Sequence, residues 1–175
     1  MHKTGLDEYL KVIFPEIDDW IHDKTIPNLK TKIRPDYRSE KLKLIVEFNG
    51  LPHYQKPDVI LKDKEKEQLY VALGYKVVVI PYFIQLTNKA VKTLFGVSVD
   101  EQLFDETIPS LYSCDACTPA FLCPMGIQRM AKDFINFPEQ YEVNINSMKK
   151  EEKIELTYWN LLEEEYSKLK SKDIK

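Results

Sequence analysis

The sequence predicts a mixed α/β domain in which helices flank a central sheet, followed by a mostly helical C-terminal extension. Three patterns indicate this architecture: an amphipathic repeat near the N-terminus, two alternating stretches typical of a hairpin, and a charged helix leading into a β-branched strand. The expected order over residues 1–96 is α-β-β-β-α-β, and residues 97–175 form the extension, packed on this core. A chain of 175 residues is long enough for one domain with such an appended element.

The first half of the core begins with a helix. Residues 5–21 carry apolar side chains three and four positions apart, and Pro15 predicts a bend or break in this helix. A short strand is expected near residues 25–29. Residues 30–37 and 42–48 then alternate polar and apolar side chains, so we expect them to pair as a hairpin.

The second half of the core adds a central strand between helices. Residues 75–80 form an uninterrupted run rich in Val, which is typical of a strand buried on both faces. Gly74 is expected to end the charged helix before it. Helices are predicted by amphipathic spacing at residues 58–73, 85–95, 125–134 and 149–170.

The charge distribution is compatible with binding to phosphates. The net charge is −3, yet residues 24–76 hold twelve Lys and Arg against seven Asp and Glu. This basic segment could attract nucleic acid, although solvated lysines on a helix would give a similar count. No apolar run reaches the roughly 20 residues that span a bilayer, and Met1–Thr4 lacks the apolar core of a signal peptide. A cytoplasmic location without a membrane partner is therefore expected.

The hairpin brings two carboxylates onto one face. Alternation places Asp36, Glu47 and Asn49 together with Lys32 and Arg34, opposite the apolar side chains. A turn centred between residues 40 and 41 would pair Arg34 with Glu47 and Lys32 with Asn49. Asp36 and Glu47 would then be diagonal neighbours, about 7 to 8 Å apart at the backbone.

Such a pair of carboxylates could form a catalytic metal site, or it could form surface ion pairs only. Two carboxylates and the backbone carbonyl of Phe48 could hold Mg²⁺, which prefers oxygen ligands and keeps several waters. The ion would polarise a phosphate and lower the pKa of a bound water. Alternatively, Asp36 and Glu47 are exposed strand residues that pair with Arg34 and Lys43.

The stretch Arg34-Pro35-Asp36-Tyr37, followed after nine residues by Glu47-Phe48-Asn49-Gly50-Leu51-Pro52-His53-Tyr54, resembles the motif of PD-(D/E)xK nucleases. It is most similar to the branch of very-short-patch repair (Vsr-like) endonucleases, and the similarity extends over residues 5–95. The resemblance implies a restriction-endonuclease-like fold and Mg²⁺- or Mn²⁺-dependent hydrolysis of phosphodiester bonds, with DNA as the expected substrate. It also implies that Asp36, Glu47 and the Phe48 carbonyl are the metal ligands, as expected of a restriction, repair or phage-defence endonuclease.

The motif departs from the family at one position, because Asn49 stands where the family has lysine. Lys32 could return an ammonium group to the site, or it could only contact phosphate or solvent. His53 is a candidate base or water-orienting residue, and Glu8 and Glu16 are candidate additional ligands. The residues predicted to contact nucleic acid are Lys30, Lys32, Arg34 and Arg38. The alternative function is a catalytically inactive module that binds nucleic acid or protein.

Three cysteines lie close together in the extension. Cys114, Cys117 and Cys123 have spacings that suit zinc or an iron–sulfur cluster, and they resemble the cysteine triplet of nucleases with an iron–sulfur staple. The fourth ligand would have to be His22, His53, Asp115 or a group from another subunit. Reduced thiols near a turn are the alternative. A homodimer would suit double-strand cleavage, and the extension could also dock a partner.

Overall fold

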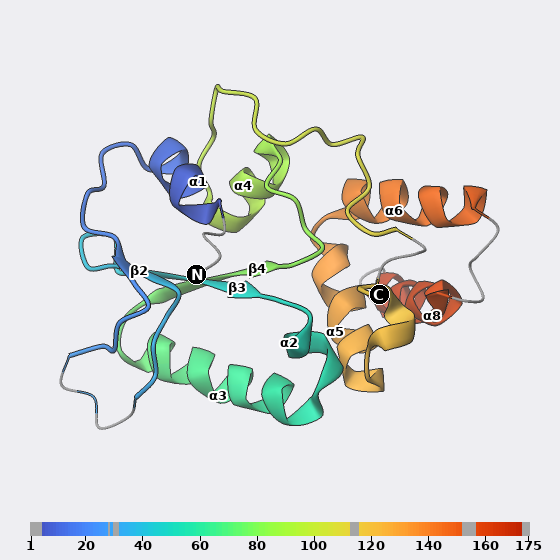
Figure 1. The fold of residues 1–175 in the computed structure, drawn as a ribbon, viewed down its shortest axis with the longest axis horizontal. Helices are drawn as coiled ribbons and strands as arrows, with labels where there is room; N and C mark the ends of the chain where they lie inside the picture. Colours follow the sequence, from blue (N-terminus) through green and yellow to red (C-terminus); the bar gives the residue numbers. More distant parts are fainter. Residues whose placement is uncertain (1–4, 28, 30–31, 113–115, 152–156, 173–175) are drawn as a thin grey trace.

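The computed structural model describes residues 5–27, 29, 32–112, 116–151 and 157–172. It contains a mixed sheet, which confirms the predicted α/β class. The four strands lie in the sheet in the order in which they occur in the chain (Figure 1). The first strand pairs antiparallel with the second and the second with the third, whereas the third and fourth are parallel. The strands are β1 (Ile21–His22), β2 (Tyr37–Ser39), β3 (Leu44–Asn49) and β4 (Lys76–Pro81).

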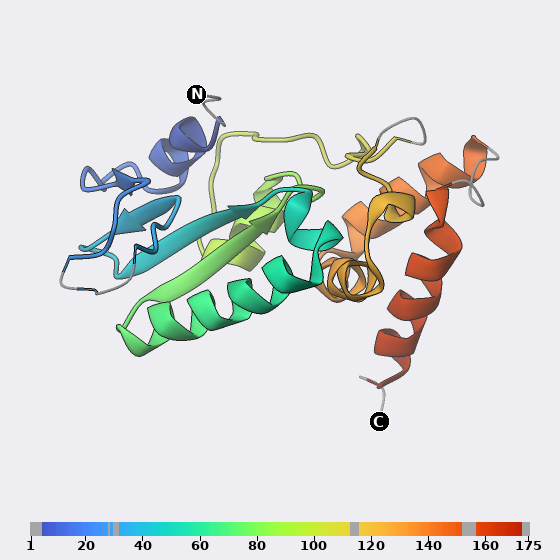
Figure 2. The same cartoon turned by 60° about the horizontal axis from the view of Figure 1, so that its bottom comes forward.

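Helices cover both faces of this sheet. Within the predicted core they are α1 (Leu6–Ile13), α2 (Pro52–Gln55), α3 (Pro57–Ala72) and α4 (Asn88–Phe95). The order is therefore α-β-β-β-α-β as predicted, with the short α2 added before α3. Helices α1 and α4 lie on one face and α3 runs along the other (Figures 1 and 2). Alternation along β3 sends Val46 into the core under α1 and α4, and Ile45 into the core under α3.

The predicted N-terminal helix is too long. Helix α1 ends at Ile13, two residues before Pro15, because a proline disfavours helical backbone in the residue before it. Ile21 and His22 form β1 and pair with Arg38 and Tyr37. The short first strand thus begins at the last residue of the segment predicted as helix, and not near residues 25–29.

The predicted hairpin register is wrong by two residues. Tyr37 pairs with Val46 and Ser39 with Leu44. The physical reason is a cap from outside the hairpin: the Asp19 carboxylate accepts hydrogen bonds from the Ser39 hydroxyl at 2.7 Å and from the amides of residues 40 and 41 at 2.9 Å. A shift of two leaves every side chain on its predicted face.

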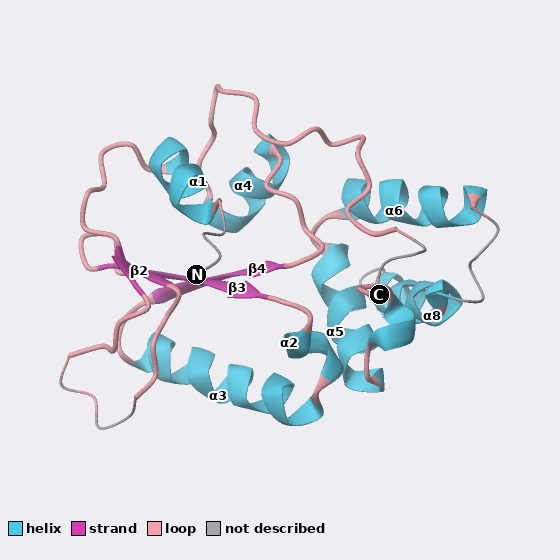
Figure 3. Cartoon of the chain, viewed as in Figure 1, coloured by secondary structure: helices cyan, strands magenta, loops and turns pink. Residues whose placement is uncertain are grey.

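The C-terminal extension packs against one end of the sheet (Figure 3). The helices in its described residues are η1 (Pro119–Phe121), α5 (Pro124–Ile135), α6 (Pro138–Lys150) and α8 (Trp159–Lys172). The segment predicted as one helix from Lys149 instead contains the end of α6 and most of α8. Tyr54, Phe83, Phe134 and Trp159 share one buried cluster, so the extension and the core have a common interior.

Helix α5 docks closely on α2 at a glycine. A Cβ atom on Gly126 would lie 1.7 Å from the carbonyl oxygen of Tyr54, a distance that no side chain can occupy. The amide of Cys123 also donates to this carbonyl at 3.2 Å. No helix in the described part of the chain is both long enough and apolar enough to cross a membrane.

Candidate functional site

Asp36 and Glu47 lie closer together than predicted. Extending the observed register by one residue places Asp36 directly opposite Glu47, and not on the diagonal. An Asp36 carboxylate oxygen accepts a hydrogen bond from the Phe48 amide at 2.7 Å. Glu47 is 9% exposed, whereas Asp36 is half-buried. The two carboxylates therefore lie side by side, just before the start of β2 and near the end of β3.

The surroundings of Glu47 favour a cation beside it. Burial raises the pKa of the Glu47 carboxyl, Lys66 opposes that shift, and the nearby charge of Asp36 raises the pKa further. The Lys66 ammonium lies 2.9 Å from a Glu47 oxygen. One turn later on α3, Tyr70 has a raised pKa because it is buried next to the Glu47 carboxylate. A second positive charge near Asp36 would offset the remaining repulsion between the carboxylates.

The backbone of Phe48 offers a third oxygen. The carbonyls of Lys43 and Asn49 accept hydrogen bonds from Lys76 and Tyr82, so carbonyls of odd-numbered β3 residues point toward β4. The carbonyl of Phe48 therefore points toward β2, where the extended register places Pro35. Proline has no N–H to donate, which leaves this carbonyl available as a ligand.

These donors fit a hard divalent cation with incomplete protein coordination. Two carboxylates and one carbonyl leave positions for waters, as Mg²⁺ prefers. Among the described residues, no group of three His, Cys, Asp or Glu side chains could hold a metal. Neither Glu8 nor Glu16 therefore joins Asp36 and Glu47 as a third carboxylate, and Glu8 instead pairs with Lys11 at 3.2 Å.

Asn49 and Lys66 face the same small pocket. Asn49 is 4% exposed, and its side-chain nitrogen has no hydrogen-bond partner among the described residues. Glu47 and Lys66 line this pocket with Asn49. The pattern that predicts a charged helix over residues 58–73 does not single out Lys66, whose side chain is only 28% exposed and reaches the sheet. An ammonium group is thus present near Asn49, supplied by α3 and not by the strand.

His53 belongs to a second polar cluster beside this pocket. Its Nδ1 lies 2.8 Å from an Asp63 oxygen, which also accepts a hydrogen bond from Arg129 at 2.7 Å. Burial alone would raise the pKa of Asp63, but hydrogen bonds from His53 and Arg129 hold it below its ordinary value. A carboxylate on Nδ1 favours the tautomer whose Nε2 can accept a proton. Arg129 comes from α5 and also donates to the His53 carbonyl at 3.1 Å.

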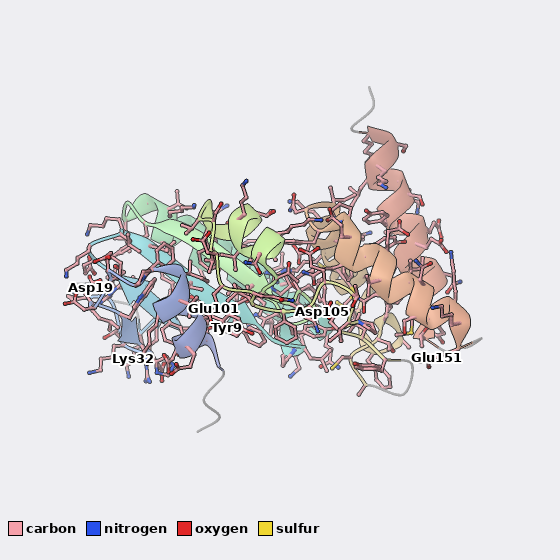
Figure 4. All side chains as sticks on the ribbon, turned by 90° about the horizontal axis from the view of Figure 1, so that it is seen from above. Tyr9, Asp19, Lys32, Glu101, Asp105 and Glu151 are labelled. Carbon is pink, nitrogen blue, oxygen red and sulfur yellow. The ribbon has the colours of Figure 1, made fainter. Side chains whose placement is uncertain are left out.

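One of the residues predicted to contact nucleic acid lies in the core. Arg38 is 3% exposed and pairs with Glu40 at 3.1 Å, so it is a core residue and cannot reach a ligand. Arg34 is exposed and pairs with Asp23 at 3.8 Å. Lys32 is exposed and lies outside β2, at the end of the molecule away from the C-terminal helices (Figure 4). The predicted pairing of Lys32 with Asn49 does not form, and Lys30 lies outside the described residues.

Two of the three cysteines have structural contacts. The Cys123 sulfur accepts a hydrogen bond from the Gly126 amide at 3.3 Å and thereby caps α5. The backbone carbonyl of Cys117 accepts the Tyr82 hydroxyl at 2.6 Å. Cys114 and Asp115 lie outside the described residues, so the predicted metal cluster remains a hypothesis.

The capping contact gives a test of the role of Cys123. Cys123→Ser keeps a capping side chain and is expected to leave the unfolding free energy close to that of the wild type. Cys123→Ala removes the cap and is expected to cost about 1 kcal/mol in chemical denaturation. Stoichiometric zinc or iron in the purified protein, lost in Cys123→Ser, would instead favour the metal cluster.

A buried acid links α2 to α5. Asp133 accepts the Tyr54 hydroxyl at 2.7 Å, and burial raises the pKa of Asp133 to about 6. The folded state therefore binds this proton more tightly than the unfolded state, in which the pKa is near 3.8. The contribution of Asp133 to stability should fall as the pH rises between these two values and stay constant above them.

Asp133→Asn keeps an acceptor for Tyr54 but removes the buried charge. We expect this variant to be more stable than the wild type at pH 8, by up to about 3 kcal/mol. Thermal melts between pH 4 and pH 8 measure the difference. Equal slopes of stability against pH in both proteins would contradict this account of the Asp133 carboxyl.

Comparison with known proteins identifies no relative of this chain. No protein-family model, curated protein or solved structure gives a significant match to this chain.

Proposed function

We propose that the protein is a divalent-metal-dependent nuclease with a restriction-endonuclease-like fold of the PD-(D/E)xK type. The observation that carries the proposal is the pair Asp36 and Glu47, opposite each other on neighbouring strands, with the Lys66 ammonium 2.9 Å from Glu47. This arrangement supplies two acidic ligands and one cation, which are the groups that the nuclease motif uses. The order of helices and strands and the mixed sheet also support the proposal.

Each residue of the site has a chemical role in this proposal. Asp36, Glu47 and the Phe48 carbonyl would hold the cation, which when bound polarises the phosphate and acidifies a water. Lys66 would stabilise the charge that develops on the phosphate, in place of the lysine absent at position 49. His53 would accept the proton of the attacking water at Nε2, with Asp63 stabilising the imidazolium.

A cleavage screen tests the proposal. Supercoiled plasmid, single-stranded DNA and RNA would each be incubated with the protein in Mg²⁺ or Mn²⁺, with EDTA as the control. We expect cleavage of at least one substrate that stops when EDTA is added. Binding without cleavage across all three would overturn the nuclease proposal and favour an inactive nucleic-acid-binding module, the alternative that Asn49 in place of lysine suggests.

A further inference from the structure

A large polar groove runs between α3 of the core and α5 of the extension. Its volume is about 670 Å³. The charged side chains of its lining are Lys64, Glu67, Arg129, Lys132 and Asp133. Glu67 and Arg129 also line the pocket that contains Glu47 and Asn49. The groove is therefore continuous with the candidate catalytic site.

The lysines of this groove are available to bind an anion. Lys64 and Lys132 are exposed, and neither forms an ion pair with any described residue. By contrast, Lys62 and Lys66 on the same α3 helix pair with Asp58 at 3.6 Å and with Glu47 at 2.9 Å. Exposed cations without intramolecular partners are the groups that can neutralise phosphates without breaking an existing contact.

The acidic side chains of the groove only partly offset the positive charge of its lysines and Arg129. Asp133 is turned toward α2, where it accepts the Tyr54 hydroxyl at 2.7 Å. Glu67 is the other acid of the lining. Arg129 stands at the junction of the groove with the catalytic pocket, held there by its 2.7 Å hydrogen bond to Asp63. The cations therefore outnumber the acids along a path that leads to Glu47.

We propose that this groove binds the phosphate backbone of the nucleic-acid substrate, with Lys64 and Lys132 as phosphate contacts on opposite walls. This inference rests on the proposed nuclease function and adds where the substrate lies. It assigns substrate binding to α3 and α5, in place of the face predicted from Lys30, Lys32, Arg34 and Arg38. Because α5 supplies one wall, the C-terminal extension is part of the substrate site.

The test is the salt dependence of binding in a catalytically disabled protein. Fluorescence anisotropy with labelled single-stranded and duplex DNA in EDTA would be measured over a series of salt concentrations. The background variant would be Glu47→Gln. Adding Lys64→Gln and Lys132→Gln is expected to weaken binding and to reduce the slope of log K against log salt by roughly 1.4 to 1.8, for two lost phosphate contacts.

Lys92 on α4 provides the matched control. It is exposed, forms no ion pair with a described residue, and lies on the opposite face of the sheet from α3. Lys92→Gln is expected to leave the slope unchanged, and thermal melts would establish that all variants are folded. An equal slope in the double variant and in Lys92→Gln would overturn the proposed groove.

The two proposals fail in different ways. Lysine-dependent binding by a wild-type protein that cleaves nothing would support the groove and reject the nuclease. Metal-dependent cleavage with a slope that does not respond to Lys64 and Lys132 would support the nuclease and reject the groove.

Discussion

Replacing Glu47 with Gln is expected to lower the rate of metal-dependent cleavage by roughly 10³-fold, because a lost metal ligand removes several kcal/mol of transition-state stabilisation. The fold should survive, since Gln has nearly the same shape and removes a carboxylate whose burial raises its pKa. Single-turnover cleavage of the substrate found in the screen measures the rate. Thermal melting of the same preparation measures stability.

Two further variants test whether the loss of activity is specific to the Asp36–Glu47 pair. Asp36→Asn retains an oxygen that can accept the Phe48 amide, so it should lose activity to a similar extent without disturbing the strand end. Glu65→Gln changes an exposed acid on α3 and is expected to cleave like the wild type. Comparable cleavage by Glu47→Gln and Glu65→Gln would show that the Asp36–Glu47 pair is not the reacting centre.

Lys66→Met is expected to reduce the cleavage rate by roughly 10²- to 10³-fold, as for the loss of one preorganised donor at a developing charge. The reason is that Lys66 provides the ammonium beside Glu47, while position 49 holds an amide. Cation binding should persist in this variant, because both acidic ligands remain. The measurements are single-turnover cleavage and calorimetric titration with Mn²⁺.

Two other lysines serve as controls for Lys66→Met. Lys62 lies on the same α3 helix and pairs with Asp58 at 3.6 Å, so Lys62→Met should retain activity. Lys32→Met tests the hypothesis drawn from the predicted hairpin register. A larger loss in Lys32→Met than in Lys66→Met would contradict the role given to Lys66.

The faces of the hairpin could be predicted from sequence, whereas its register could not. Alternation with period two is a local property, and it correctly placed Asp36 and Glu47 on one face. The register depends on Asp19, which caps the turn from about twenty residues earlier in the chain. Such a contact leaves no periodic signal in the sequence. The alternating pattern therefore predicts a turn one residue too early and a diagonal pair of carboxylates, whereas the register places them directly opposite each other.

Contributions from other helices were harder to predict. The charged residues of α3 follow one another closely in sequence, and helical spacing alone does not say which one turns inward. The position of Arg129 depends on how α5 docks, which the close approach of Gly126 to the Tyr54 carbonyl determines. Neither contact is encoded by the spacing of the PD-(D/E)xK-like motif.

The proposed nuclease site requires that Asp36 and Glu47 together bind a catalytic divalent cation. Calorimetric titration of Mn²⁺ into the wild type and into the Asp36→Asn/Glu47→Gln double variant measures this binding. We expect one cation per chain in the wild type and loss of that binding in the double variant. Equal binding in both proteins, or none in the wild type, would contradict it.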